Sequence, residues 1–250
     1  MPLSNIINTI VHADCLSVLA GLPDKCVDLV LTDPPYGINA ARDRNSQKHG
    51  WVDYPESGWD SSRPIADVFK EIRRVSKNQI VWGDNYFADL LPSSMGWLVW
   101  DKGQRDFSLA DGELAYTSFN KALRIFSYSR VAALREGKCH PTQKPVPLFT
   151  WCLSLFSKPG DIVLDPFCGS GTAALACHAL GRHFVCIERS EYYVNVARNR
   201  LRDAQAQLSL FGGRENGTGG GSENSAQQLK GNMPAEAVEV NLFDAGTSPV

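Results

Sequence analysis

Short apolar runs alternate with longer amphipathic stretches along most of the chain. Two of these runs, 27–32 and 162–164, each end at an acidic residue followed by a turn. Continuous runs rich in β-branched residues are typical of parallel strands that helices cover on both faces. Similar short runs follow at 80–82, 97–100 and 184–187, and helical patterns lie between the runs at 65–76, 172–180 and 191–207. This alternation predicts an α/β fold with a doubly wound, mostly parallel sheet.

Two polar stretches interrupt the pattern. Residues 38–60 are rich in Arg, Asn, Ser and Gly and have no sustained period, which predicts a long loop. Loops of this length inside compact enzymes usually have a function. Residues 212–232 consist mostly of Gly, Ser, Asn, Gln and Glu, with almost nothing to bury, and this composition is typical of a disordered linker. We therefore expect one domain over residues 1–211 and a disordered acidic tail over 212–250.

The charge balance is nearly neutral but uneven. The chain has 25 Lys and Arg against 27 Asp and Glu, a net charge of -2. This balance excludes a strongly basic nucleic-acid coat and a highly acidic binder. Only two basic but six acidic residues lie in 203–250, so the preceding 202 residues are net positive, by +2.

The cysteines, histidines and hydropathy indicate a compartment. The seven Cys include no CxxC pair, the N-terminus has no secretory pattern, and no apolar run approaches the ~20 residues that cross a bilayer. These features predict a reduced, cytoplasmic protein without a membrane function. The five His lie far apart and have no acidic or Cys partners at metal-binding spacing, so we predict no metal.

A glycine motif, VLDPFCGSGT at 163–172, follows one apolar run and precedes a helical pattern. Gly169 and Gly171 lack a Cβ atom, so a ligand can approach the backbone and the helix can start close to the sheet. No Lys follows the last Gly, and a third Gly is missing, so the motif is neither a P-loop nor the dinucleotide fingerprint. The next run ends at Glu188, which can accept hydrogen bonds from a ribose. Together these features predict an adenosyl ligand without a pyrophosphate, although a Gly-X-Gly alone can be a structural turn.

A second motif, Asp33-Pro34-Pro35-Tyr36-Gly37, ends the first apolar run. Consecutive prolines remove two N–H donors and fix φ, which holds the adjoining carbonyl in one direction. The carboxylate and this carbonyl form a pair of acceptors that matches an exocyclic NH₂ group, and Tyr36 offers a flat surface to the ring that carries it. The alternative is an ordinary turn or helix cap, because Asp and Pro are common in both.

The order of three motifs resembles a known family. DPPYG at 33–37, HPTQKP at 140–145 and DPFCGSGT at 165–172 resemble the DNA amino-methyltransferases that use S-adenosylmethionine (SAM). The catalytic motif comes first, which is similar to the circularly permuted β group, where a target-recognition segment separates the two motifs. The resemblance covers about residues 7–211. It implies a class I, Rossmann-like methyltransferase fold and a phage-like or prophage-like adenine-N6 enzyme that acts on double-stranded DNA with the target base flipped out.

The resemblance also implies residue roles. Catalysis would fall to Asp33, Pro34, Pro35 and Tyr36. Among the cofactor contacts, Asp165 would lie near the methionine amino group, Glu188 on the ribose and Asp14 on the adenine. Asp14 also fits a helix N-cap, and Lys144, placed with Thr142 near the cofactor carboxylate, also fits a solvated loop charge. The full set implied to bind the cofactor is Asp14, Cys15, Thr142, Lys144, Asp165, Phe167, Gly169, Gly171 and Glu188.

The segment between the motifs, 102–138, has seven basic and four acidic residues interleaved with aromatic ones. Such a mixture suits phosphate contact and target reading, although alone it would pass for an ordinary solvated surface. Its position between the motifs favours the recognition segment. The DNA-contact candidates are Lys102, Arg105, Lys121 and Arg124.

The sequence also suggests two binding partners, and three alternative functions were considered. Gln207 to Phe211, QLSLF, resembles the peptide by which bacterial replication and repair proteins bind the sliding clamp, unless Leu208 and Phe211 pack back on the domain. A homodimer is expected by analogy with the β group. Cytosine-N4 transfer is the alternative chemistry, although that branch more often has Ser at position 33. Protein glutamine methylation fits less well, because that group has NPPY after the glycine motif. A DNA-binding module that has lost catalysis is disfavoured by the intact DPPY.

Overall fold

The computed structural model describes residues 2–39, 60–106, 109–135, 139–140 and 142–212, with side chains as far as Gln207. The chain divides into two units, Met1–Leu210 and Phe211–Val250, and the description below concerns the first. Most of the predicted loop 38–60 and nearly all of the predicted tail lie outside the described residues, so both stay predictions. Within the described residues, no helix is both long enough and apolar enough to span a membrane.

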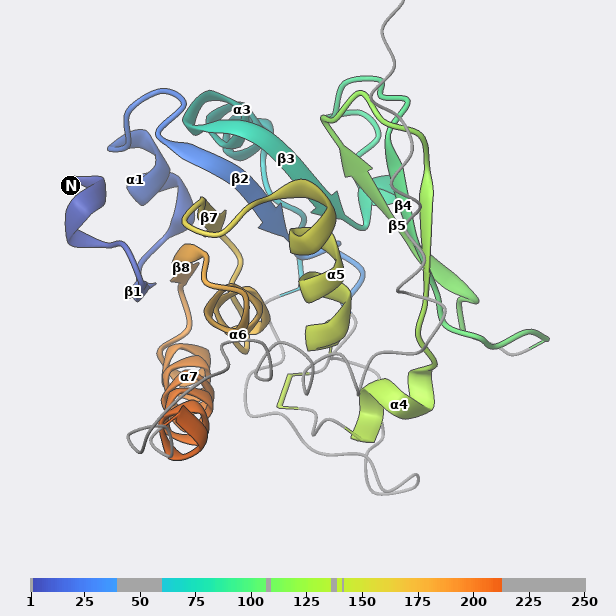
Figure 1. Cartoon of the computed structure of the whole chain (residues 1–250). Helices are drawn as coiled ribbons and strands as arrows, with labels where there is room; N and C mark the ends of the chain where they lie inside the picture. The colour runs from blue at the N-terminus through green and yellow to red at the C-terminus, as the bar shows by residue number, and fades with distance from the viewer. Residues whose placement is uncertain (1, 40–59, 107–108, 136–138, 141, 213–250) are drawn as a thin grey trace, which may run out of the picture. The chain divides into compact units, whose positions relative to one another are not determined.

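A mixed sheet of eight strands forms the centre of the first unit (Figure 1). The order across the sheet is β1-β8-β7-β2-β3-β5-β4-β6. Neighbouring strands are parallel except where β5 pairs with β3 and β4. The predicted mostly parallel sheet is thus confirmed. The strands are β1 (Thr9–His12), β2 (Val27–Thr32), β3 (Ser76–Trp82), β4 (Trp97–Asp101), β5 (Gly112–Thr117), β6 (Arg124–Ser127), β7 (Ile162–Asp165) and β8 (His183–Glu188).

Helices cover both faces of the sheet, as the alternation in the sequence predicts. Strand β2 shows why: Leu29 and Leu31 pack in the cluster that contains α5 and α6 residues, whereas Val30 between them packs in the cluster of α1 and α3. Successive side chains of a strand point to opposite faces, so a run that is apolar throughout needs two covers. The helices are α1 (Cys15–Ala20), α3 (Ala66–Val75), α4 (Arg130–Arg135), α5 (Val146–Phe156), α6 (Thr172–Ala179) and α7 (Glu191–Gly212), with short 3-10 turns η1 (Leu3–Asn5) and η2 (Asp84–Tyr86).

The reversal of strand order lies between β2 and β7. From β2 the chain continues to β3 on one side, whereas from β7 it continues to β8 on the other. The two strands pair directly, Leu29 with Val163 and Val30 with Leu164. In open α/β sheets, ligands bind outside the carboxyl ends of the strands at such a reversal. The two sequence motifs follow these two strands, so the fold brings them to the same edge of the sheet.

The segment 102–138 does not form one insertion outside the sheet. We expected a separate recognition segment, but β5 and β6 both lie within it and belong to the sheet. Their pattern in the sequence is weak because β6 has a single buried residue, Phe126, and β5 buries only its second half. The parts that extend beyond the sheet are the connection of β4 to β5 and the region of α4 (Figure 1). That these parts read the target stays a prediction.

Candidate active site

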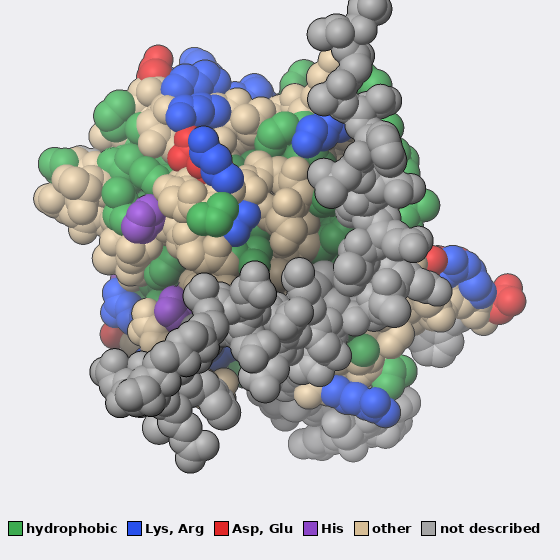
Figure 2. Space-filling view, in the orientation of Figure 1, with side chains coloured by type: hydrophobic (Ala, Val, Ile, Leu, Met, Phe, Trp, Pro, Cys, Tyr) green, Lys and Arg blue, Asp and Glu red, His purple; other side chains and the backbone are tan. Residues whose placement is uncertain are grey.

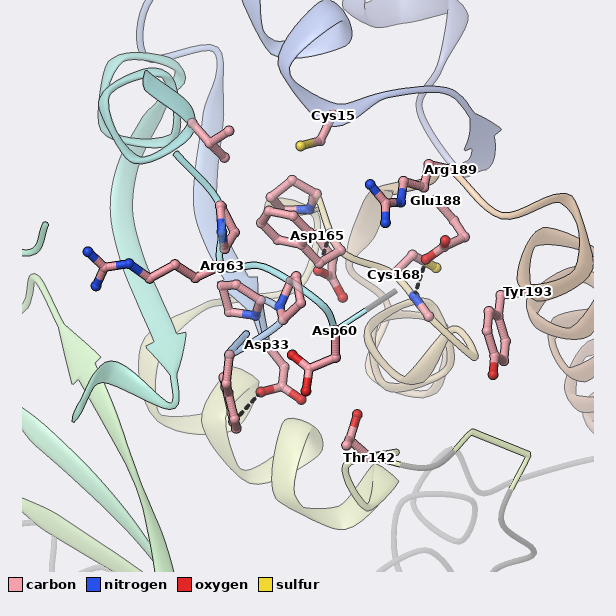
Figure 3. Close-up of a pocket in the computed structure, with 18 of the residues that line it drawn as sticks. Cys15, Asp33, Asp60, Arg63, Thr142, Asp165, Cys168, Glu188, Arg189 and Tyr193 are labelled. Atoms are coloured by element: carbon pink, nitrogen blue, oxygen red, sulfur yellow. Dashed lines mark hydrogen bonds between the residues drawn. The ribbon is translucent and has the colours of Figure 1, made fainter. Parts of the chain in front are cut away.

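The loops after β2 and β7 line the same cavity, which has a volume of about 330 Å³. Asp33 to Tyr36 form one side, and Asp165 to Gly169 form another (Figure 3). The structure therefore brings together two motifs that are more than 100 residues apart in the sequence. The sequence-predicted residues that line this cavity are Asp14, Cys15, Asp33, Pro34, Pro35, Tyr36, Thr142, Lys144, Asp165, Phe167, Gly169 and Glu188.

Three carboxylates, those of Asp14, Asp165 and Glu188, line the cavity on the side of the glycine motif. Asp14 caps α1, accepting a hydrogen bond from the Ser17 amide at 3.1 Å, so the capping interpretation holds while the side chain also faces the cavity. Asp165 accepts hydrogen bonds from Thr32 Oγ1 at 2.7 Å and from the Phe167 amide at 3.0 Å. Burial raises the pKa of Asp165 to about 7. A negative charge in this position needs a positive partner.

Glu188 ties the end of β8 to the glycine loop. Its Oε2 accepts a hydrogen bond from the Gly169 amide at 2.9 Å, and Oε1 accepts one from the Ser190 amide at 2.8 Å. Burial raises the pKa of this carboxyl as well. Each carboxylate oxygen has a further lone pair, so the hydrogen bonds that orient Glu188 leave it able to accept from ribose hydroxyls.

The two glycines of the loop have different reasons to be glycine. Gly169 lines the cavity with φ at +51°, and a Cβ atom there would meet nothing closer than 3.8 Å. Gly171, with φ at +86°, is absent from the cavity wall, and a Cβ atom there would lie 2.9 Å from the Cβ of Ala197 on α7. Gly171 therefore permits close packing of α6 against α7, and its contact with a cofactor, which the resemblance implies, stays a prediction.

The cysteines beside the site are protonated thiols. Burial raises the pKa of Cys15 to about 11. The pKa of Cys168 is raised well above its usual value by its contact with Cys186 and by burial. Neither thiol is poised for nucleophilic attack, since attack requires the thiolate. Among the described residues, no group of three His, Cys, Asp or Glu side chains is placed to hold a metal ion.

Tyr36 is held from three directions. Its hydroxyl donates a hydrogen bond to Asp33 Oδ1 at 2.6 Å, and its ring stacks on Tyr86, with centroids 4.5 Å apart. Gly83 allows this position, because a Cβ atom there would overlap Tyr36 Cε1. Burial raises the pKa of the phenol well above its usual value, so Tyr36 remains a donor. Tyr86 covers one ring face, which leaves only the other for a target base.

Lys144 lies on the catalytic motif. Its Nζ is 2.6 Å from Asp33 Oδ2 and donates to the Tyr36 hydroxyl at 3.1 Å. The resemblance implies a position near the cofactor carboxylate, and the alternative was a solvated charge. The structure instead leaves this side chain only 4% exposed, in an ion pair with Asp33. A charge this well buried must be paired, because burying an unpaired charge would lower the free energy of unfolding by several kcal/mol.

Glu113 completes the charge cluster around Lys144. Its Oε2 is 2.9 Å from Lys144 Nζ, and its Oε1 is 2.6 Å from Lys102 Nζ. Burial alone would raise the pKa of Glu113, but Lys144 and Lys102 together lower it to about 2. Although burial favours the neutral amine, Asp33 and Glu113 raise the pKa of Lys144, so the ammonium stays charged. Burial raises the pKa of Asp33, and Lys144 opposes that effect.

Thr142 stands next to this cluster and beside His140. Its amide and hydroxyl both lie 3.3 Å from His140 Nδ1. The ring of His140 packs against Tyr193, with centroids 4.4 Å apart, and both residues line the cavity. The segment 140–145 thus connects the glycine loop to the catalytic motif, with His140 at one end and Lys144 at the other.

Comparison with known proteins identifies the kind of site. The family model of N6/N4 DNA methylases, described as DNA methylase, matches residues 81–199. The match covers just under half of the chain and includes the glycine motif, Glu188 and Lys144. This part of the chain is similar to the N6/N4 DNA methylases. Residues 33–37 lie outside the matched range, and the shared cavity joins the DPPYG motif to it.

Individual methyltransferases extend the likeness over about four fifths of the chain. The type II methyltransferase M.HinfI of Haemophilus influenzae is 27% identical, over 80% of this chain and 70% of its own length. The type II methyltransferase M2.DpnII of Streptococcus pneumoniae is 25% identical, over 77% of this chain and 88% of its own. The fold also matches the crystal structure of the M1.HpyAVI–SAM complex, with a TM-score of 0.52 and 26% sequence identity. The match covers 80% of this chain and all of that one.

The four predicted DNA contacts do not lie together. Lys102 and Arg105 follow β4 at the edge where the cavity opens, whereas Lys121 and Arg124 lie where β6 begins, at the opposite edge. Lys102 pairs with Glu113, and the exposed Arg105 pairs with Asp101 at 2.9 Å. On the face seen in Figure 2, Lys and Arg side chains lie in separate groups, several of them beside acidic ones. Of the four, only Arg105 is both exposed and at the cavity edge.

Three residues of the site, Glu113, Asp60 and Arg63, were not predicted from the sequence. Glu113 is one acidic residue in a basic segment, and nothing local distinguishes it. Asp60 accepts a hydrogen bond from the Gly37 amide at 2.7 Å and lines the cavity with Arg63. Asp60 is the last residue of the predicted loop, and Arg63 follows it. The positions of these residues depend on contacts between distant segments of the chain, and a motif does not contain that information.

Proposed function

We propose that this chain transfers a methyl group from SAM to the N6 amine of adenine in a flipped-out DNA base. One observation carries the proposal: Asp33 and the glycine loop line a single cavity. The carboxylate that can hold an amine and the loop that can hold a cofactor therefore face the same space. An adenosyl-binding protein without catalysis would not need Asp33 and its support from Tyr36 and Lys144.

The cavity suits SAM in charge as well as in shape. SAM has a sulfonium and an ammonium group, and the cavity presents Asp165 and Glu188, whose pKa values burial raises. A cation restores the ionised state of buried carboxylates, so binding and charge are complementary. Asp165 would hold the ammonium, Glu188 the ribose and Asp14 the adenine, with Phe167 and Gly169 along the ligand. When bound, the cofactor supplies an electrophilic methyl group.

The chain's own residues orient the target amine. Asp33 and the carbonyl of Pro34 would accept the two amine protons, and this favours a pyramidal nitrogen with its lone pair directed away from the ring. Pro35 fixes the backbone behind that carbonyl. Tyr36 and Lys144 immobilise the Asp33 carboxylate from two sides, so little reorganisation is needed during transfer. The amine becomes acidic once methylated, and Asp33 is the nearest acceptor for the proton that it loses.

Cytosine-N4 transfer remains the alternative, because cytosine carries its amine in the same relation to a ring nitrogen. One experiment separates the candidates. Unmethylated DNA is incubated with the protein and SAM, digested to nucleosides and analysed by mass spectrometry. We expect N6-methyldeoxyadenosine. N4-methyldeoxycytidine would favour the alternative, and no methylated nucleoside, with DNA binding retained, would indicate an inactive binding module.

The other partners stay predictions. The clamp-like motif at 207–211 lies in the last turns of α7, and its side chains beyond Gln207 lie outside the described residues. We expect purified sliding clamp to bind the protein, and Leu210→Ala with Phe211→Ala to abolish that affinity. An unchanged affinity would exclude docking through this motif. A homodimer and a phage or prophage source rest on resemblance alone.

A further inference from the structure

Four charged side chains of alternating sign run from the surface into the site. Lys102 contacts Glu113 at 2.6 Å, Glu113 contacts Lys144 at 2.9 Å, and Lys144 contacts Asp33 at 2.6 Å. They come from segments far apart in the sequence, namely the turn after β4, strand β5, the loop before α5 and the loop after β2. Apolar side chains of similar volume would generally stabilise a fold as well or better. The buried ammonium therefore indicates a function at this point.

Lys144 stands between two cavities. The first contains the glycine loop and the carboxylates of the proposed cofactor site. The second, of about 510 Å³, is lined by the aromatic residues Tyr36, Tyr86 and Trp100, together with Glu113. Tyr36, Thr142 and Lys144 line both. A flat base entering through the second cavity would meet Lys144 at the boundary with the first cavity, which Asp33 lines.

The third proton of Lys144 faces Glu113. The other two are donated to Asp33 Oδ2 and to the Tyr36 hydroxyl. Glu113 Oε2 lies 2.9 Å from the same Nζ, close enough to share the remaining proton, and this contact helps to raise the pKa of Lys144. A ring nitrogen that entered from the second cavity would share this proton with Glu113, whose carboxylate keeps its ion pair with Lys102.

We propose that Lys144 reads the target base by donating a hydrogen bond to the ring nitrogen beside the amine. An acceptor, Asp33 Oδ2, and a donor, Lys144 Nζ, lie side by side at 2.6 Å. This pair is complementary to the Watson–Crick edge of adenine, where the N6 amine donates and N1 accepts. Guanine and thymine present the reverse order, a carbonyl beside an N–H, and would place like groups against each other. The inference rests on the proposed function and adds its specificity residue.

The test compares two bases that differ in one ring atom. Once sequencing of methylated DNA has located the target, duplexes are made with adenine or 1-deazaadenine there, opposite an abasic position so that neither base breaks a pair. We expect the wild type to prefer adenine in kcat/KM by about 10- to 100-fold, the value of one hydrogen bond to a charged group. In Lys144→Met both rates fall and the preference disappears. A purely structural role would leave the ratio unchanged.

Controls separate recognition from damage. Replacing adenine by 7-deazaadenine alters the opposite edge of the base, and we expect the same response from wild type and Lys144→Met. Cofactor affinity of the variant should stay within a few-fold of wild type. If Lys144→Met does not fold, Lys144→Gln, which keeps a neutral donor, should retain part of the preference.

Three results would overturn the inference. The first is a wild-type enzyme whose kcat/KM is about equal for adenine and 1-deazaadenine. The second is a Lys144→Met enzyme that keeps the wild-type preference for adenine. An active enzyme with either outcome leaves the proposed function intact. A wild type that methylates no DNA removes the proposed function and this inference together. If the product is N4-methylcytosine, the same comparison is made with cytosine and 3-deazacytosine.

Discussion

The two ends of the cavity are built in different ways. At the cofactor end, Asp165 and Glu188 are oriented by backbone amides and by a neighbouring hydroxyl, and burial raises the pKa values of both. At the catalytic end, Asp33 is held by a phenol and a buried ammonium. The cofactor end has carboxylates that need a cation, whereas the catalytic end already contains its own. The difference indicates which end recruits a charged ligand and which end orients a neutral one.

The largest expected effect would separate the two ends. Asp33→Ala should lower the rate of methyl transfer by about 10³-fold or more, comparable to the loss of a key transition-state hydrogen bond. Cofactor affinity should stay within a few-fold, because Asp33 faces the base. Single-turnover methylation and calorimetric titration with SAM measure the two quantities. Asp24→Ala, at an exposed carboxylate, is the control. Normal turnover by Asp33→Ala would refute the assignment.

Asp165→Asn should show the opposite separation. Loss of the charge that holds the cofactor ammonium should weaken SAM binding by about 10- to 100-fold. Between pH 5 and about 7, wild-type affinity should fall by up to tenfold for each unit of decreasing pH, because Asp165, with its pKa near 7, must lose a proton to bind. The SAM affinity of Asp165→Asn should not show this fall with decreasing pH. An equally steep profile in both proteins would show that another group titrates.

The same substitution should stabilise the ligand-free protein. The pKa of Asp165 in the folded state, about 7, lies above the ordinary value of 3.8, so between these pH values the folded state binds more protons than the unfolded state. The free energy of unfolding therefore falls as pH rises through this window and stays lower above it. At pH 8, Asp165→Asn should raise the free energy of unfolding by about 1–4 kcal/mol. Denaturant titration checks this, and equal stability at pH 8 would contradict it.

Much of the fold and of the cofactor end is predictable because it is local. The apolar runs around 27–32 and 162–164, their acidic ends and the glycine motif each specify a strand and the turn that follows it. The glycine roles were only partly predictable, because the need for Gly171 comes from Ala197 on another helix. The catalytic cluster was harder to predict from the sequence. Asp33 is in a motif, but Glu113 and Lys144 reach it only through the pairing of β3 with β5 and the course of the loop before α5.

The two loop glycines test this local account. Gly171→Ala should destabilise the protein by about 1–3 kcal/mol, since its Cβ would press on Ala197 and its φ is positive. Gly169→Ala has the positive φ without the contact, so its cost should be smaller, about 1–2 kcal/mol. Its effect should instead appear in SAM affinity, because its Cβ would enter the cavity wall. Thermal unfolding with and without SAM distinguishes the two variants, and the reverse ranking would contradict the assignment.

The smallest expected effect concerns the DNA surface. Arg105→Ala, at the edge where the cavity opens, should weaken DNA binding a few-fold at low salt and reduce the slope of affinity against salt concentration. Lys121→Ala, at the opposite edge of the sheet, should leave both quantities unchanged. Fluorescence anisotropy with a labelled duplex measures them. Equal losses in the two variants would show that DNA also contacts the far edge.

A bisubstrate ligand tests the central claim most directly, namely that the target amine and the methyl donor meet in one cavity. Such a ligand joins the N6 atom of adenine through a short linker to the 5′ position of the adenosyl group, and its affinity is measured by calorimetry against that of the adenosyl half alone. The account predicts that the joined ligand binds at least tenfold more tightly, and that Asp33→Ala removes this advantage while the affinity of the adenosyl half remains. Equal affinity of the joined ligand and its adenosyl half for the wild-type protein would contradict it.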